Sequence, residues 1–206
     1  MIVVTGATGF IGSNICEFIH KHHSDKNIVA VDTFDDDNKL KNLSNINIKE
    51  FVKPEDLSSF MNDSFESITA VIHMGAISST TERDLNLIVR NNMNFPYMIW
   101  KLCSEKKIKF IYASSAATYG DGRNGFLDSF DIKYLEKIRP INLYGWSKNQ
   151  FDKWVFQEVK NGNAPPVWAG LKFFNVYGPR EDHKAGMKSM VAQAYKQIQK
   201  NGKVKL

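Results

Sequence analysis

The chain reads Val3-Val4-Thr5-Gly6-Ala7-Thr8-Gly9-Phe10-Ile11-Gly12 near its N-terminus, and this stretch predicts a strand, a tight turn and a helix. Gly6 lets the strand turn sharply, Gly9 lets the backbone approach a pyrophosphate, and Gly12 lets the helix pack close to the strand. The first helical turn then offers free N–H groups and a positive dipole end to phosphates. The stretch therefore predicts a dinucleotide site; the alternative is a tight strand–helix turn without a ligand.

The composition fits a globular domain. The 206 residues are 43% hydrophobic and 24% charged, and no apolar run is long enough to span a bilayer. Met1 leads straight into strand residues, so no secretory signal is visible and we expect a cytoplasmic location. Cys16 and Cys103 sit in apolar helical patterns and read as core residues, and without a Cys/His cluster we expect no metal site.

The net charge of +5 allows nucleic acid as a partner, but a nucleotide phosphate explains the same bias more economically. We therefore expect no nucleic acid and no membrane among the partners.

Strand and helix patterns alternate along the chain. We expect strands at 28–32, 46–52, 70–73, 109–113 and 167–174, helices at 11–21, 85–106, 144–159, 184–200 and from 54 onward, and loops at 35–38 and 121–142. This order predicts an α/β fold, a Rossmann-type doubly wound parallel sheet. We expect a cofactor domain over residues 1–175 and the start of a substrate-binding region over 176–206.

Asp32 follows a strand about 20 residues past the last glycine, where a carboxylate commonly holds the adenosine ribose. That position favours NAD, whereas Lys39 and Lys53 could each meet a 2′-phosphate, so the residues alone leave the cofactor open. The plainer interpretation of Asp32 is a turn residue. Likewise, His73 is interpreted as a packed residue at a strand end. One of Asn91 and Asn92 is expected either to link neighbouring strands by hydrogen bonds or to contact the cofactor.

Tyr144 and Lys148 lie four residues apart, which places them on one face of a helix. A nearby ammonium lowers the pKa of a phenol, so Tyr144 is expected to act as a general base. Ser115, at a strand end, is expected to orient the reacting oxygen while hydride passes to or from a nicotinamide.

The glycine spacing and the Tyr144–Lys148 pair resemble the extended short-chain dehydrogenase/reductase superfamily. Three stretches narrow the resemblance to the ADP-L-glycero-D-manno-heptose 6-epimerase family over essentially the whole chain: Tyr112–Gly120, Ser78–Glu82 and Phe174–Lys184. The resemblance implies an isomerase with bound NADP that oxidises C6″ of the sugar nucleotide ADP-heptose to a ketone and returns hydride to the opposite face. It also implies a role in lipopolysaccharide core biosynthesis and a homo-oligomer, a pentamer in the family.

Matched position by position, the resemblance implies two acid–base groups, Tyr144 and Lys184. Ser115 and Lys148 complete the expected catalytic residues. The resemblance implies cofactor contacts at Gly6, Gly9, Phe10, Ile11, Gly12, Asp32, Thr33, Lys39, Lys53, Met74, Gly75, Ala76, Ile77, Ser78, Asn91, Lys148, Val176 and Lys184. It implies substrate contacts at Ser115, Asn175, Gly186 and Gln193, although the family usually has Ser and His at the last two.

Family members continue for about another half-length, so the resemblance implies a C-terminally truncated chain that binds NADP weakly and turns over little. Robust epimerisation by the 206 residues would contradict that expectation.

Two alternatives remain. Another nucleotide-sugar enzyme would share the same catalytic groups, but a dehydratase should carry an Asp-Glu pair where Ala116 and Ala117 stand. A non-catalytic NADP-binding protein would have no need of intact Ser115, Tyr144 and Lys148.

Overall fold

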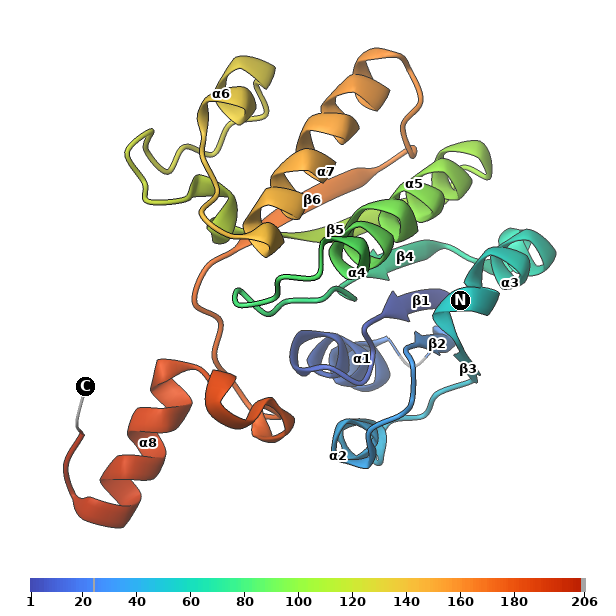
Figure 1. Ribbon diagram of the computed structural model, residues 1–206. Coiled ribbons are helices and arrows are strands. Elements are labelled where there is room, and N and C mark those ends of the chain that lie inside the picture. Colours follow the sequence, from blue (N-terminus) through green and yellow to red (C-terminus); the bar gives the residue numbers. More distant parts are fainter. Residues whose placement is uncertain (24, 205–206) are drawn as a thin grey trace.

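Six strands form one parallel sheet in the computed structural model, which describes residues 1–23 and 25–204 (Figure 1). The strands are β1 (Ile2–Thr5), β2 (Ile28–Val31), β3 (Glu50–Val52), β4 (Ala70–His73), β5 (Lys109–Ser115) and β6 (Trp168–Phe173), in the spatial order β3-β2-β1-β4-β5-β6. The chain moves outward from β1 to β3 and returns to β4 on the other side of β1, which is the doubly wound order. The predicted fold class is confirmed.

Helices connect the strands. They are α1 (Phe10–His22), α2 (Asp37–Leu40), α3 (Leu57–Ser64), α4 (Leu85–Val89), α5 (Phe95–Glu105), α6 (Ile132–Lys137), α7 (Leu143–Lys160) and α8 (Met190–Asn201). Shorter turns are η1 (Lys41–Leu43), η2 (Pro54–Asp56), η3 (Phe65–Ser67), the π-helical η4 (Arg90–Asn94), η5 (Ala116–Tyr119) and η6 (Asp182–Met187).

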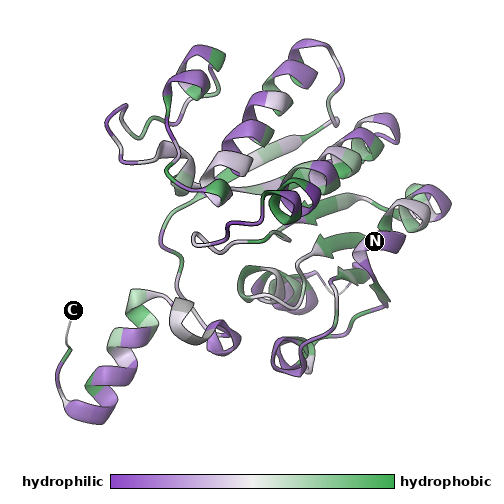
Figure 2. Ribbon diagram, viewed as in Figure 1, coloured by the Kyte–Doolittle hydropathy of each residue, from purple (hydrophilic) through white to green (hydrophobic). Residues whose placement is uncertain are grey.

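The sheet has an apolar layer on each face. Val3 of β1 belongs to one buried cluster with Trp100 and Phe110, whereas its neighbour Val4 belongs to a second cluster with Cys16. A strand covered on both faces reads as a continuous hydrophobic run, which is why the strands were visible in the sequence. Figure 2 shows the central strands as the most hydrophobic part of the fold. Both cysteines are free and buried, as predicted.

Several boundaries differ from the predictions. β3 pairs only at residues 50–52 because Ile46 bonds back to Leu43 in a turn and packs into the α1-side cluster. The expected loop at 35–38 begins α2, with the Asp36 carboxylate capping it at Asn38 N. The expected loop at 121–142 contains α6, whose Leu135 is 1% exposed.

The expected helix at 184–200 is two elements, η6 and α8. Ser189 interrupts it with an extended backbone and caps α8 by accepting a hydrogen bond from Ala192 N. In Figure 1, α8 projects away from the sheet.

Across the residues described, no helix is long and apolar enough to cross a membrane. Within the same residues, no three His, Cys, Asp or Glu side chains gather in a way that could hold a metal ion.

Candidate active site

Two glycines meet where the strand order reverses, at the carboxyl ends of β1 and β4. Gly6 has a φ of 64°, and a Cβ on it would lie 2.7 Å from the Cα of Gly75. The Thr5 hydroxyl accepts a hydrogen bond from Gly75 N at 3.1 Å and shares a second hydrogen bond with Nδ1 of His73, 2.7 Å away. Burial lowers the pKa of His73 to about 3, so the ring is neutral. His73 is the packed strand-end residue that was predicted.

The turn that follows is shaped by Gly12 and Gly9. A Cβ on Gly12 would lie 2.1 Å from the carbonyl oxygen of Gly6, so α1 can lie this close to the turn only without a side chain there. Gly9 is the N-cap of α1, and no side chain caps the helix. The first N–H groups of α1, including those of Phe10 and Ile11, are therefore available to an anion. These residues fit the diphosphate of a dinucleotide.

The sequence left Asp32 either as a ligand of the adenosine ribose or as a turn residue, and the structure shows its hydrogen bonds within the turn. Its Oδ2 accepts hydrogen bonds from Thr8 N at 3.0 Å and Thr8 Oγ1 at 2.6 Å, which ties the end of β2 to the glycine turn. Its Oδ1 accepts from Thr33 N at 2.9 Å. Lys39 is half-buried on α2, and Lys53 is exposed directly after β3. Asp32 N donates to Val52 O at 3.3 Å, so Lys53 directly follows the residue that pairs with Asp32.

The segment after β4, residues 74–78, is held by Asn92 rather than by Asn91. Asn92 is 1% exposed; its Oδ1 accepts from Ile77 N at 2.8 Å, and its Nδ2 donates to Ile77 O at 2.9 Å and to Ser147 Oγ at 3.2 Å. Asn91, which the resemblance named as a cofactor contact, donates to Leu87 O within its own helix. Asn92, and not Asn91, is therefore the asparagine that links neighbouring segments by hydrogen bonds.

We expect Asn92→Ala to lower the free energy of unfolding by about 2 kcal/mol, because it leaves the Ile77 N–H and C=O groups without their partner. Denaturant unfolding measures this loss. Asn91→Ala is the matched control and should cost less than about 1 kcal/mol, since only a helix-surface bond is lost. Equal losses in the two variants would contradict the assignment.

Ser115 and Tyr144 come together because η5 and α7 pack closely. Ser115 is the last residue of β5, and its Oγ accepts from Ala117 N at 3.1 Å. A Cβ on Gly145 would lie 2.5 Å from the carbonyl oxygen of Ala117, so the start of α7 can touch η5 only at a glycine. The Ser115 hydroxyl forms a hydrogen bond with Tyr144 that favours its phenolate. The predicted pair of Ser115 and Tyr144 is thus assembled in the structure.

The electrostatics of Tyr144 differ from the expectation. Burial raises the pKa of Tyr144, and the Ser115 hydrogen bond only partly opposes that rise. Lys148 is 4% exposed, and burial lowers its pKa to about 8, while Asp152 raises it. The expected lowering of the phenol pKa by Lys148 is therefore not seen, because desolvation raises the pKa of Tyr144 and the Ser115 hydrogen bond is what opposes the rise. Tyr144 is therefore a phenol at neutral pH.

Lys184, in η6, lies against the start of α1. Its Nζ is 4.2 Å from the centre of the Phe10 ring, the first residue of α1. Burial lowers the pKa of Lys184, and Glu181 opposes that shift. Glu181 is 4% exposed and holds the segment together by accepting from Gly178 N, Ser189 N and Ser189 Oγ. Glu181 was not predicted as a site residue; its place three residues before Lys184 is the signal that could have indicated it.

The remaining predicted contacts are only partly brought together. Val176 joins Phe10 and Ile11 in an apolar hollow of about 370 Å³. Asn175 and Gln193 are exposed, and Gln193 donates to Lys188 O at 2.7 Å. Gly186 is exposed, and a Cβ added to it would have no neighbour within 4 Å. The predicted substrate positions other than Ser115 therefore form no enclosed site within the described residues.

Comparison with known proteins gives consistent matches. The family described as "NAD dependent epimerase/dehydratase family" matches residues 2–206. Proteins named ADP-L-glycero-D-manno-heptose-6-epimerase from Fusobacterium nucleatum and Brachyspira hyodysenteriae are 44% and 37% identical over all of this chain. The chain covers 61% and 64% of those two relatives.

Solved structures agree. The Helicobacter pylori ADP-L-glycero-D-manno-heptose-6-epimerase superimposes with a TM-score of 0.82 at 28% identity, over 98% of this chain and 64% of that one. A Bacillus cereus UDP-glucuronic acid 4-epimerase in complex with NAD gives a TM-score of 0.72 at 27% identity, over 97% of this chain and 63% of that one.

Proposed function

The chain belongs to the NAD dependent epimerase/dehydratase family, and on that premise we propose that it carries the cofactor site and catalytic groups of an ADP-heptose 6-epimerase. The reaction would invert C6″ of ADP-D-glycero-D-manno-heptose to the L-glycero epimer. It would supply heptose for a lipopolysaccharide core from the cytoplasm, in a homo-oligomer. The relatives at 37–44% identity support this substrate.

The observation that carries the proposal is that two groups able to transfer protons are held at two separate places. Tyr144 on α7 is hydrogen-bonded to Ser115, the last residue of β5, and Lys148 follows it on the same helix. Lys184 lies against Phe10 at the start of α1. Inversion at a carbinol needs proton transfer on both faces of the intermediate ketone. A chain with two separately held acid–base groups meets that need.

In this proposal each residue has a defined task. The Gly6–Gly12 turn and the free N–H groups of α1 hold the diphosphate, and Asp32 holds the adenosine ribose. A bound nicotinamide supplies the reversible acceptance of hydride. Tyr144 takes the proton of the C6″ hydroxyl on one face, Ser115 orients that oxygen, and Lys148 stabilises the phenolate. Lys184 handles the proton on the opposite face.

We propose NADP as the cofactor, with NAD the weaker ligand. Lys39 lies on α2, which follows Asp32 in the chain, and Lys53 follows Val52, the residue paired with Asp32, so these two ammonium groups are the candidates to meet a 2′-phosphate. Calorimetric titration with NADP and with NAD tests the choice: NADP should bind at least about tenfold more tightly, which corresponds to about 1.4 kcal/mol.

The function is tested by incubating the natural chain, at its full length, with ADP-D-glycero-D-manno-heptose and NADP and no other redox partner. Chromatography should show the L-glycero epimer without net formation of NADPH. A second candidate comes from the likeness to a UDP-glucuronic acid 4-epimerase. If UDP-sugars are turned over and the heptose is not, the heptose assignment is wrong and the Tyr144–Lys148 chemistry stands.

A further inference from the structure

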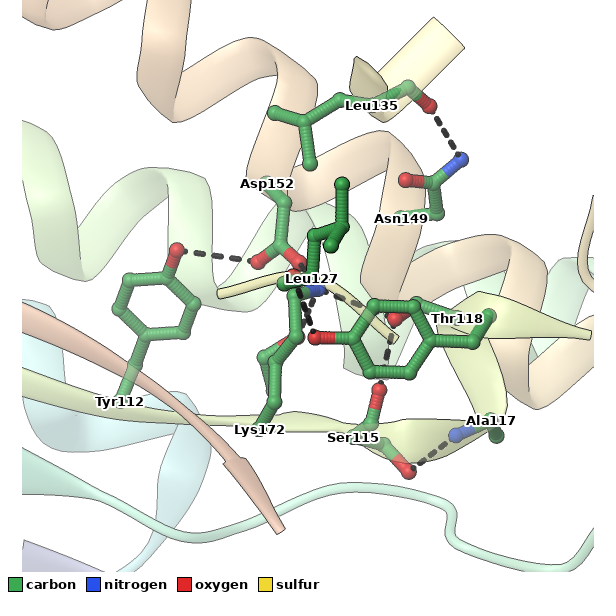
Figure 3. Close-up of polar contacts among 11 residues, drawn as sticks. Tyr112, Ser115, Ala117, Thr118, Leu127, Leu135, Asn149, Asp152 and Lys172 are labelled. Carbon is green, nitrogen blue, oxygen red and sulfur yellow. Dashed lines mark hydrogen bonds and ion pairs between the residues drawn. The ribbon is translucent and has the colours of Figure 1, made fainter. Parts of the chain in front are cut away.

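A buried ion pair lies behind the catalytic groups. Lys172 of β6 places its Nζ 2.5 Å from Oδ2 of Asp152 on α7, and their side chains are 18% and 5% exposed. The Asp152 carboxylate also accepts hydrogen bonds from Tyr112 OH at 3.0 Å and Ser114 Oγ at 2.8 Å. Figure 3 shows the Tyr112 hydroxyl and the Lys172 side chain pointing toward Asp152.

The pair is joined to Ser115 through one side chain. Thr118 Oγ1 donates to Ser115 O at 2.8 Å and accepts from Lys172 Nζ at 3.0 Å (Figure 3). Thr118 is fully buried, so these bonds are shielded from water. Lys172 therefore contacts both α7, which carries Tyr144 and Lys148, and the turn that begins at Ser115.

The pair also reaches Lys148 electrostatically. Asp152 follows Lys148 by four residues, so the two share one face of α7. Asp152 on α7 raises the pKa of Lys148, and Lys172 of β6 is paired with that same carboxylate. The charge of Lys148 also helps to lower the pKa of His73 on β4, whose ring is neutral. Asp152 is thus the acid that favours the charged form of Lys148, and Lys172 competes for the same carboxylate.

We propose that Asp152 and Lys172 are positioning residues that set the charge of Lys148 by opposite effects while holding α7 against the Ser115 turn. The inference rests on the proposed function for its catalytic meaning. A buried pair kept only for stability would leave Lys148 titrating as before, or would disturb it in the same direction when either partner is lost. If instead the two residues set the charge of Lys148, losing Asp152 and losing Lys172 must shift the pKa of Lys148 in opposite directions.

The test is direct titration of Lys148 by NMR in the 206-residue chain labelled with 13C at lysine Cε, without substrate or cofactor. Loss of one resonance in Lys148→Met assigns the signal. Asp152→Asn should lower the pKa of Lys148 by about one pH unit, and Lys172→Met should raise it by a similar amount. Lys172→Arg and Asp152→Glu keep the charges and should leave the titration within about 0.3 pH unit of the parent.

Either single variant leaves a lone buried charge and is at risk of unfolding. The double variant Asp152→Asn with Lys172→Met removes both charges together. Its Lys148 should titrate within about half a pH unit of the parent, because the two effects oppose each other. A fall of a full unit in the double variant, or shifts of one sign in both single variants, would overturn the proposal. Since no substrate enters this measurement, it stands or fails separately from the heptose assignment.

Discussion

Tyr144→Phe is expected to reduce epimerisation about a thousandfold while leaving cofactor affinity within about twofold of the parent. The change deletes only the phenolic oxygen, which is the atom that Ser115 contacts and the one that must take the substrate proton. Tyr144 is uncharged before the cofactor binds, so the loss of its hydroxyl removes no charge that the cofactor would feel. Turnover by chromatography and NADP binding by calorimetry are measured on the same preparation.

Tyr97→Phe is the matched control. Tyr97 packs between Phe151 and Trp154 at 5.6 and 4.4 Å between ring centres, in the core rather than at the Ser115 turn. It should keep turnover within about twofold of the parent. If Tyr144→Phe also keeps its turnover, Tyr144 is not the acid–base group; a chain that binds NADP but shows no turnover in any form would support the non-catalytic alternative.

The fold could be predicted because its strongest signals are local. Buried parallel strands give unbroken apolar runs, and the turn at Gly6–Gly12 marks the first crossover. The parallel pairing of the strands could then be predicted from the alternation of strands and helices along the chain. What could not be predicted depends on contacts far apart in sequence: α6 forms because Leu135 finds a cluster with Tyr119 and Ile138.

In the candidate site too, local sequence signals could be recognised and effects of packing could not. Ser115, Tyr144 and Lys148 have recognisable types and spacing, so they could be found from the sequence. The pKa of Tyr144 could not, because its direction depends on how much water the packed turn excludes. Asp152 and Lys172 also escaped notice, since an acid on a helix and a lysine on a strand usually face solvent. Only the packing of β6 beside β5 brings them together.

Gly12→Ala is expected to be the most damaging single substitution in the cofactor site. Its Cβ would lie 2.1 Å from Gly6 O, 2.8 Å from Gly6 C and 3.0 Å from Ala7 Cα, all of them backbone atoms that no rotamer change can move aside. The start of α1 must therefore shift, and the free energy of unfolding should fall by about 3 kcal/mol. The shift also carries the N–H groups of Phe10 and Ile11 away from the phosphates.

Loss of two hydrogen bonds to a charged diphosphate, at about 1.5 kcal/mol each, corresponds to a weakening of NADP binding by about a hundredfold. Calorimetric titration below the unfolding range separates this loss from the loss of stability. Gly186→Ala is the matched control: no atom lies within 4 Å of its added Cβ, so both stability and NADP affinity should stay at the parent values. Full NADP affinity in Gly12→Ala would show that the phosphates are held elsewhere, because the close approach of α1 to the Gly6 carbonyl is what aims the helix at them.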